Sequence, residues 1–267
     1  MLSRWGQRSH HYVEQCTKCH HLQSTATPLT TTTARCFGDG PFHHAAGDTI
    51  IRQFAAKTPT FLSLSDIISY TGSTDERRRE YGKFIWNELP IRISHRVVEL
   101  SSLPYNLSNT SSIRELRELY THSFHLFRML ESPDSDAAER EFVDQMKAHF
   151  ESLKSAVPLV AHGLRQCILE NPNQAALVQE CPFLNGFLDR FNGNRIGTRL
   201  LTGQYITCRE QRERGLLGQA QDRMVGLIDF ECDPRAILEN AIDDALRLAE
   251  SNYYGQCPDV LIKVELL

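Results

Sequence analysis

Apolar side chains recur at steps of three and four residues between about residues 75 and 207. This spacing places them on one face of an α-helix, and such a face needs an apolar partner surface. The pattern predicts a first helix over residues 75–100, and Ser73 with Glu76 fits a capping box at its start. Pro90 lies inside the pattern, so a kink or a break is expected there. The apolar face consists of Tyr81, Ile85, Leu89, Ile93, Val97 and Leu100.

Three more helical patterns follow, over residues 113–127, 142–168 and about 182–201. The longest of them contains Pro158, where a kink is expected. Short polar loops that contain proline or asparagine separate the patterns. Four long amphipathic helices joined in this way predict a helix bundle, because each apolar face finds its nearest partner on the others. We assign the bundle to residues 48–214.

The pattern changes after Arg214. Residues 225–230 form a short apolar run typical of a strand, residues 234–251 predict a helix, and residues 260–267 predict another strand. This order predicts the start of an α/β domain over residues 215–267. A domain of about forty residues buries too little surface to be stable alone. We therefore expect a fragment, an alternative product or a chain that depends on a partner.

Residues 1–47 form an amino-terminal tail with a different composition. Its first part is rich in Ser and Thr and contains four basic residues but only one acid, Glu14. The basic residues are Arg4, Arg8, Lys18 and Arg35. A basic, hydroxyl-rich and acid-poor tail predicts an organelle transit segment. The alternative is a disordered tail that carries no address.

Other features exclude some classes of protein. A net charge of −4 gives no general attraction to nucleic acid, and no stretch approaches the roughly 20 apolar residues of a membrane span. Cys16 and Cys19 with His20 match a haem-attachment pattern or half of a zinc site, but no second cysteine pair completes a metal site. The scattered cysteines are expected to be reduced and mostly part of the packing.

Arg195 and Arg199 follow Phe187 and Phe191 at steps of four, so all four residues share one helical face. A face that buries aromatic rings and then presents two guanidinium groups needs negative charge beside it. Acidic side chains elsewhere in the bundle are one source of that charge. A small anion is the other, because two arginines one turn apart can grip a carboxylate.

Several short segments occur together in a distinctive order. Residues 88–96 read Glu-Leu-Pro-Ile-Arg-Ile-Ser-His-Arg, and residues 119–124 contain Leu119-Tyr120 and Ser123-Phe124. Residues 187–191 read Phe-Leu-Asp-Arg-Phe, and residues 194–204 contain Asn-Arg-Ile-Gly-Thr-Arg-Leu-Leu followed by Gly203-Gln204. Over about residues 50–267, this ordered set resembles the mitochondrial pyruvate dehydrogenase kinases and the branched-chain ketoacid dehydrogenase kinase.

The resemblance implies a function and an architecture. Members of this family are transferases of the mitochondrial matrix, protein-serine/threonine kinases that phosphorylate and inactivate the E1 subunit of a 2-oxoacid dehydrogenase complex. Their amino-terminal half is a four-helix regulatory bundle that docks on lipoyl domains of the E2 core. Their carboxy-terminal half is a GHKL-type domain that binds ATP and magnesium and forms most of the homodimer interface. The fold class implied here is therefore mainly α, a four-helix bundle followed by the beginning of an α/β ATP-binding domain.

The resemblance also implies a pocket for pyruvate-like or ketoacid-like anions in the bundle. Tyr120, Ser123, Arg195 and Arg199 match positions that line it. Two positions depart from the family: Leu153 replaces a usual histidine, for which His149 one turn earlier is a substitute, and Asn194 replaces a usual serine. Gln204 after Gly203 favours the pyruvate branch, whereas His95 suits either branch.

The family's nucleotide site depends on a glutamate and an asparagine four residues later, followed by glycine-rich boxes. No such pair precedes Leu267; Glu239 and Asn240 are adjacent, and Ala236 lies four before Asn240. The ATP and magnesium site is therefore expected outside this chain, which we predict to be inactive alone. A truncated form that binds the E2 lipoyl domain or a full-length kinase is the alternative, and a structural bundle without a ligand is a third reading.

Overall fold

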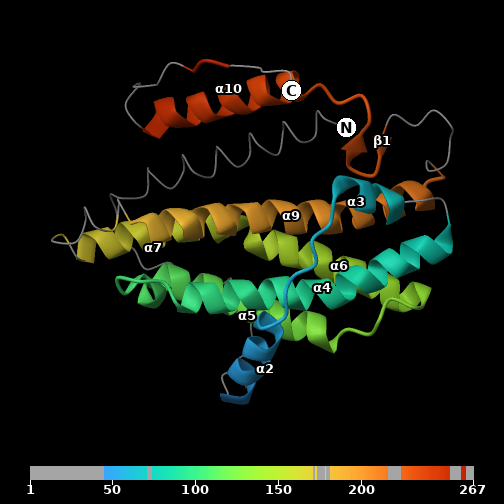
Figure 1. The fold of residues 1–267 in the computed structure, drawn as a ribbon, viewed down its shortest axis with the longest axis horizontal. Helices are drawn as coiled ribbons and strands as arrows, with labels where there is room; N and C mark the ends of the chain where they lie inside the picture. The colour runs from blue at the N-terminus through green and yellow to red at the C-terminus, as the bar shows by residue number, and fades with distance from the viewer. Residues whose placement is uncertain are drawn as a thin grey trace, which may run out of the picture. The chain divides into compact units, whose positions relative to one another are not determined.

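The computed structural model describes residues 45–70, 74–170, 172, 178, 181–215, 224–252 and 260–262. These residues fall into two compact units, one within Pro41–Phe230 and one that contains the described residues after Phe230. The predicted transit segment and the cysteine motif at Cys16 and Cys19 lie outside the described residues. The described part of the chain is mostly helical, which confirms the predicted fold class (Figure 1).

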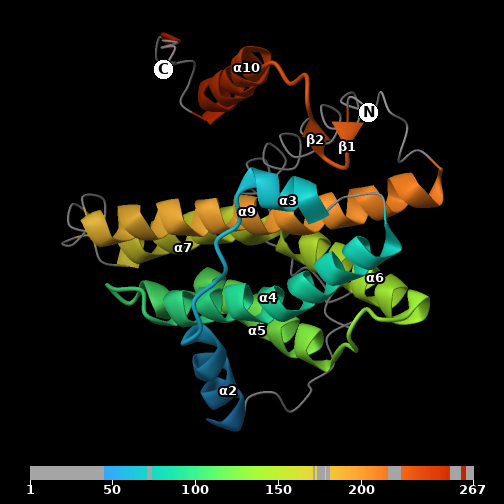
Figure 2. The ribbon, with the colours of Figure 1, turned by 45° about the vertical axis from the view of Figure 1, so that its right-hand side comes forward.

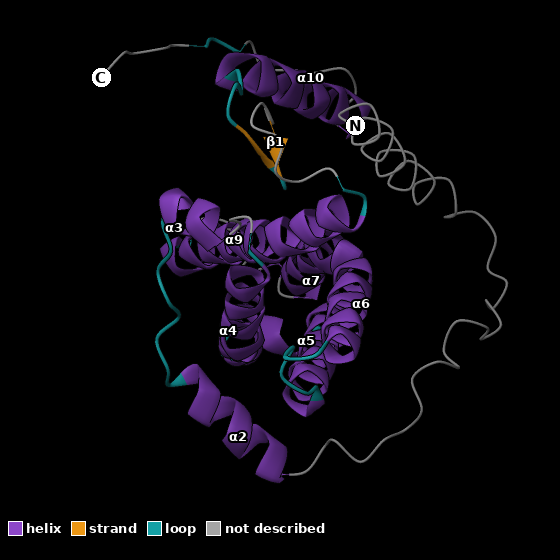
Figure 3. Ribbon diagram, turned by 90° about the vertical axis from the view of Figure 1, so that its right-hand side faces the viewer, coloured by secondary structure: helices purple, strands orange, loops and turns teal. Residues whose placement is uncertain are grey.

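Long helices form the first unit and lie side by side (Figures 1 and 2). They are α4 (Asp75–Ser101), α5 (Ser111–Met129), α6 (Asp136–Ser152), α7 (Ala156–Glu170) and α9 (Pro182–Glu213). The short helices α2 (Ala45–Ala55) and α3 (Leu64–Tyr70) precede them, and η1 (Leu107–Asn109) and η2 (Leu153–Ser155) are 3₁₀ turns. Helix α4 packs against α2, α5 and α9, and α5 packs against α7. This arrangement is the predicted bundle, seen close to end-on in Figure 3.

Helix α4 runs unbroken through Pro90, so of the predicted kink or break the structure excludes the break. Its N-cap is Thr74, whose hydroxyl accepts a hydrogen bond from the Arg77 amide at 3.4 Å, while Ser73 lies outside the described residues. Pro90 removes one helical hydrogen bond, but the neighbouring Leu89 and Ile93 are buried in the core. Burial of the apolar face on both sides of the proline keeps the helix continuous.

The third predicted helix is in fact two helices, α6 and α7, separated by η2. The interruption at Leu153–Ser155 precedes Pro158, where the sequence predicted only a kink. Pro158 is the third residue of α7, in a first turn whose amides have no helical acceptor. Because a proline ring clashes with the carbonyl four residues earlier, the helix is interrupted just before this position rather than bent at it.

The apolar run at residues 225–230 is a tight hairpin instead of the single strand that we predicted. Strands β1 (Met224–Val225) and β2 (Ile228–Asp229) pair antiparallel, with Val225 opposite Ile228. Gly226 has φ 63° and lets the chain reverse at this point. The Gln204 side chain on α9 holds the hairpin, because its amide donates to Val225 O at 2.9 Å and accepts from Leu227 N at 2.6 Å.

The second unit contains helix α10 (Pro234–Asn252), which confirms the predicted helix over residues 234–251. The described residues Val260–Ile262 have no regular secondary structure, and the rest of the predicted last strand lies outside the described residues. The start of an α/β domain therefore stays a prediction. No described helix has the length and apolar character needed to cross a membrane.

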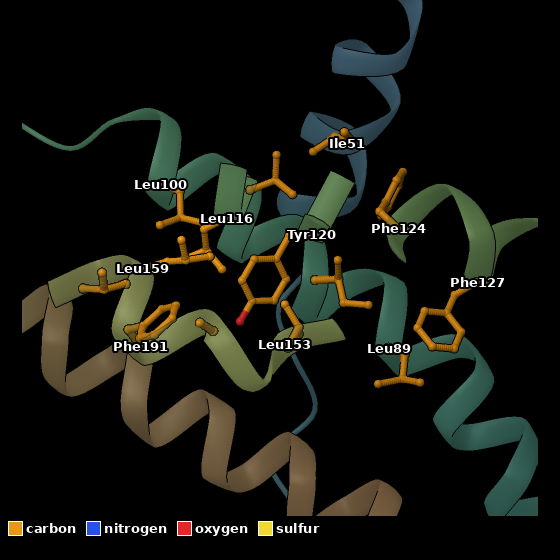
Figure 4. Packing of buried hydrophobic residues seen from close by; sticks show 14 of the residues in the cluster. Ile51, Leu89, Leu100, Leu116, Tyr120, Phe124, Phe127, Leu153, Leu159 and Phe191 are labelled. Carbon is orange, nitrogen blue, oxygen red and sulfur yellow. The ribbon is translucent and has the colours of Figure 1, made fainter. Parts of the chain in front are cut away.

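Aromatic and aliphatic side chains from every bundle helix form the core of the first unit (Figure 4). Tyr120 lies near its centre, in the same region as Leu153 and Phe191. Phe124 and Phe127, on the same helix as Tyr120, are fully buried. The core thus fixes one end of Tyr120 in apolar surroundings and leaves its hydroxyl to find a polar environment. Of the described cysteines, Cys167 and Cys208 are buried and all are free, in agreement with the predicted reduced state.

Candidate anion-binding site in the helix bundle

A cavity of about 40 Å³ opens between α4, α5, α6, η2 and α9. Two groups of polar side chains and a smaller apolar group line it. The first group is four arginines: Arg92, Arg96, Arg195 and Arg199. The second group is Tyr120, His149, Asn194 and Thr198, and the apolar group is Ile93, Phe150 and Leu153. The wall contains no Asp or Glu, so its charge is positive.

The two arginines on α4 have acidic partners. Arg92 Nε lies 2.9 Å from a carboxylate oxygen of Glu88, and its Nη2 donates to Thr60 O at 2.7 Å. Arg96 forms an ion pair with Glu99 on the same helix. The charge of Arg92 is thus balanced within α4, whereas Arg96 shares Glu99 with Arg190 on α9.

The two arginines on α9 have no such partner among the described residues. Arg195 is half-buried, lies over the Phe191 ring at 5.9 Å and makes one long hydrogen bond of 3.4 Å to Leu153 O. Arg199 is exposed and lies over the Phe150 ring at 6.0 Å. No described carboxylate forms an ion pair with either, so acidic side chains in the described bundle do not supply the negative charge that the pair needs.

Tyr120 provides a neutral hydroxyl inside this positive cavity. It is only 3% exposed, and burial raises its pKa to about 12. Arg195 and Arg96 act in the opposite direction, because a nearby positive charge favours the phenolate. Burial prevails, so the phenol keeps its proton at neutral pH and can donate a hydrogen bond to an anion.

Ser123 does not line the cavity but contacts a residue that does. Its hydroxyl lies 2.7 Å from Nδ1 of His149 and donates to Leu119 O at 2.9 Å. Burial lowers the pKa of His149 to about 4, so the ring is neutral at physiological pH. The structure thus brings Tyr120, Arg195 and Arg199 to one wall and places Ser123 directly behind it.

Sequence reasoning also identified His149 and Leu153, and both lie on the wall. It assigned no role to Arg92, Arg96 or Thr198, although Arg92 and Arg96 stand within the segment that carries the resemblance. Their spacing of four residues on α4 was a usable signal, since it places both side chains on one helical face. What the sequence lacked was the information that this face of α4 meets α9.

A nucleotide or metal site is not found among the described residues. No group of three or more His, Cys, Asp or Glu side chains in them could hold a metal ion. Glu239 on α10 pairs with Arg235 at 2.8 Å, and the Asn240 amide donates to Ala236 O at 2.8 Å. Both contacts are local to α10, so no described residue is assigned to ATP or magnesium.

A helix bundle with an arginine-lined cavity is the class that the fold and the site define. The family described as mitochondrial branched-chain alpha-ketoacid dehydrogenase kinase matches residues 61–229, which include the whole cavity. The chain therefore belongs to the family of mitochondrial pyruvate dehydrogenase kinases and branched-chain ketoacid dehydrogenase kinases.

Curated relatives agree with this assignment. The mitochondrial pyruvate dehydrogenase (acetyl-transferring) kinase of Arabidopsis thaliana is 28% identical over 213 residues, which cover 79% of this chain and 55% of the relative. Isozyme 4 of the same kinase in Homo sapiens is 29% identical over 221 residues, which cover 79% and 49%. The chain spans about half the length of the curated relatives that it matches. These names confirm the predicted mitochondrial localisation at the level of the family.

Proposed function

We propose that this chain represents the regulatory bundle of a mitochondrial protein-serine/threonine kinase that phosphorylates and inactivates the E1 subunit of a 2-oxoacid dehydrogenase complex. Family membership and the printed names of the relatives support this function. Gln204 favours the pyruvate dehydrogenase branch, and pyruvate dehydrogenase is the complex that we propose first. The proposed partners are the E1 subunit and the lipoyl domain of the E2 subunit, and the cofactors are ATP and magnesium.

The cavity is proposed to bind a small carboxylate that regulates the kinase. One observation carries this part: Arg195 and Arg199 face one cavity, and no described carboxylate balances their charge. Two guanidinium groups one helical turn apart suit the two oxygens of a carboxylate. The protonated Tyr120 hydroxyl supplies a further donor for an oxygen on the neighbouring carbon, which fits a 2-oxo or 2-hydroxy acid.

Calorimetric titration of the full chain with pyruvate, dichloroacetate and 2-oxoisovalerate tests the proposed ligand. Arg195→Ala and Arg199→Ala should each weaken binding at least about tenfold, because charge-assisted hydrogen bonds contribute about 1.5–3 kcal/mol each. Arg212→Ala is the matched control, since Arg212 lies on the same helix, pairs with Asp75 and does not line the cavity. Equal affinity in all variants would reject the cavity as the binding site.

A catalytically inactive form that binds the E2 lipoyl domain or a full-length kinase is the second candidate, because the described residues supply no nucleotide site. A phosphorylation assay separates the two candidates. The purified chain is incubated with labelled ATP, magnesium and the E1 subunit of either the pyruvate or the branched-chain 2-oxoacid dehydrogenase complex. Phosphate transfer to E1 supports the kinase directly. Binding to lipoylated but not unlipoylated E2 domain, without transfer, supports the second candidate. Sedimentation of the chain alone and with a full-length kinase tests homodimer and mixed-dimer formation.

A further inference from the structure

His149 is a deeply buried polar side chain of the cavity. It is 5% exposed, and its ring lies among aromatic side chains, with centroids 6.5 Å from Tyr120, 5.3 Å from Phe127 and 5.5 Å from Phe150. Nδ1 contacts the Ser123 hydroxyl, and no hydrogen-bond partner for Nε2 is found among the described residues. Because His149 is part of the cavity wall, Nε2 is the ring nitrogen left for a ligand.

The contacts of Ser123 determine which nitrogen of His149 carries the proton. The hydroxyl lies 2.9 Å from Leu119 O and 2.7 Å from His149 Nδ1, but it has one proton to donate. If the Ser123 hydroxyl proton pointed to Nδ1, the Ser123 and Leu119 oxygens would lie 2.9 Å apart with no hydrogen between them, which is unfavourable. Both contacts are satisfied only when Ser123 donates to Leu119 O and accepts from Nδ1–H. Nε2 of the neutral ring is then an acceptor.

A second proton on His149 is disfavoured by its surroundings. The ring is buried, which lowers the pKa of His149 to about 4. Four arginines and no carboxylate line the same cavity, so the wall itself offers a cationic imidazole no counter-charge. The imidazole therefore presents a lone pair to the ligand at neutral pH.

We propose that this cavity selects 2-hydroxy carboxylates over the corresponding 2-oxo carboxylates, with His149 as the specificity-determining residue. The inference rests on the proposed function of the cavity as a small-carboxylate site. A ligand hydroxyl beside both rings donates to Nε2 of His149 and accepts from the Tyr120 hydroxyl. A keto oxygen has no proton, so it accepts from Tyr120 and leaves Nε2 unpaired. Sites built to bond a ligand hydroxyl discriminate strongly against analogues that lack it.

Matched pairs of ligands test the selectivity in the full chain. Lactate, as each enantiomer, is compared with pyruvate, and 2-hydroxyisovalerate is compared with 2-oxoisovalerate, by calorimetric titration. At least one enantiomer of the hydroxy acid should bind at least about tenfold more tightly than the oxo acid, because one buried hydrogen bond is gained. Equal or tighter binding of the oxo acids overturns the selectivity but leaves the proposed carboxylate site intact. No binding of any of these acids rejects both.

Ser123→Ala removes the acceptor of Nδ1–H while His149 stays in place. The imidazole can then protonate Nε2 instead, so the ratio of hydroxy-acid to oxo-acid affinity should fall to about one or below. Ser152→Ala is the matched control, since the Ser152 hydroxyl donates to the backbone oxygen of His149 at 2.8 Å and does not touch the ring. An unchanged ratio in Ser123→Ala overturns the role of the tautomer.

The tautomer itself can be read without a ligand. Nitrogen-15 NMR of the chain with labelled histidine, assigned by comparison with His149→Gln, distinguishes a protonated Nδ1 from a protonated Nε2. The inference requires the Nδ1–H form in the wild-type chain at neutral pH. Observation of the Nε2–H form, or of the imidazolium, overturns it even if the ligand affinities cannot be compared in a variant that folds poorly.

Discussion

Arginines lie between α4 and α9 in two regions of the bundle. The two regions differ in whether a carboxylate pairs with the arginines of α9. In the first region Arg78 and Arg209 lie beside Glu139, a carboxylate that is 1% exposed on α6. In the second region, roughly three to four helical turns away along α9, Arg195 and Arg199 face the cavity without a carboxylate. The same pair of helices therefore carries one charge cluster that is complete and one that is open to an anion.

The complete cluster is held by short contacts. Arg78 Nη1 lies 2.8 and 2.7 Å from the two oxygens of Glu139, and the Tyr205 hydroxyl donates to Oε1 at 2.6 Å. Removal of one partner would leave a buried charge uncompensated, so such a cluster fixes structure. The open cluster differs, because no described carboxylate pairs with Arg195 or Arg199 and the partner that we propose for them is a bound anion. Paired buried charge therefore stabilises this fold, whereas unpaired charge lies at the site that we propose for an anion.

The largest expected effect is at Glu139. Glu139→Gln should lower the free energy of unfolding by about 3 kcal/mol, because Arg78 would lose its buried counter-charge and keep only the exposed Asp75 at 3.4 Å. Urea unfolding followed by circular dichroism measures the loss. Lys147→Ala is the control, since Lys147 and Glu210 also connect α6 and α9 but are largely exposed, and the change there should stay within about 1 kcal/mol. Similar losses at both sites would show that the buried Glu139 cluster is no more important for stability than the exposed ion pair of Lys147 and Glu210.

The pH dependence of the cavity region should be the next largest effect. The pKa of His149 is about 4 in the folded chain and 6.5 in its ordinary state, so the unfolded chain binds more protons between these values. Stability should therefore fall as the pH is lowered from 6.5 towards 4, by about 3 kcal/mol more in the wild-type chain than in His149→Phe. Unfolding curves collected across this range measure the difference. Parallel curves for the two proteins would contradict the buried neutral imidazole.

Gly82 lies against the Glu139 cluster and provides a second test of its packing. A Cβ at this position would lie 2.6 Å from the Tyr205 hydroxyl oxygen, so Gly82→Ala must displace the ring that bonds Glu139. We expect a loss of about 1–3 kcal/mol, which is typical of overpacking in a core. Gly197→Ala on α9 is the matched control, since a Cβ there meets nothing within 4 Å, and it should stabilise the helix by about 0.5–1 kcal/mol. Thermal unfolding of both variants tests the contrast.

The smallest effect on stability is expected in the open cluster. Arg195→Met should change the free energy of unfolding by less than about 1 kcal/mol, because no ion pair is lost and the cation–π contact with Phe191 is long, at 5.9 Å. The same variant should lose the stabilisation that a bound carboxylate gives to the wild-type chain. Thermal shifts with and without pyruvate measure both quantities. A loss as large as that of Glu139→Gln would show that Arg195 is a structural residue.

Much of the helical organisation was predictable because it depends on local spacing. The steps of three and four that end at Leu100 predicted α4, and the steps that join Phe191 to Arg195 and Arg199 predicted a shared face on α9. The predictions were wrong where the spacing of apolar residues contains no information on backbone geometry. The apolar run around Gly226 hid a chain reversal, and the continuous apolar spacing across Leu153 hid the interruption at η2.

The candidate site was predictable only in part for the same reason. Tyr120, Ser123, Arg195 and Arg199 were named from a resemblance, and spacing alone joined only the two arginines. The contact between Ser123 and His149 links residues 26 positions apart on different helices, and no local pattern contains it. The tautomer of the ring, and with it the hydrogen-bonding character of the cavity, follows from that contact.

The sequence by itself determined that arginines recur along α9, since helical periodicity is a property of neighbouring residues. It did not distinguish Arg209 from Arg195, because both are arginines on the same helix. Only the tertiary structure placed Glu139 beside Arg209 and a cavity beside Arg195. The physical reason is that the energy of a charge depends on the dielectric and the partners around it, and both are set by the helices that pack against it.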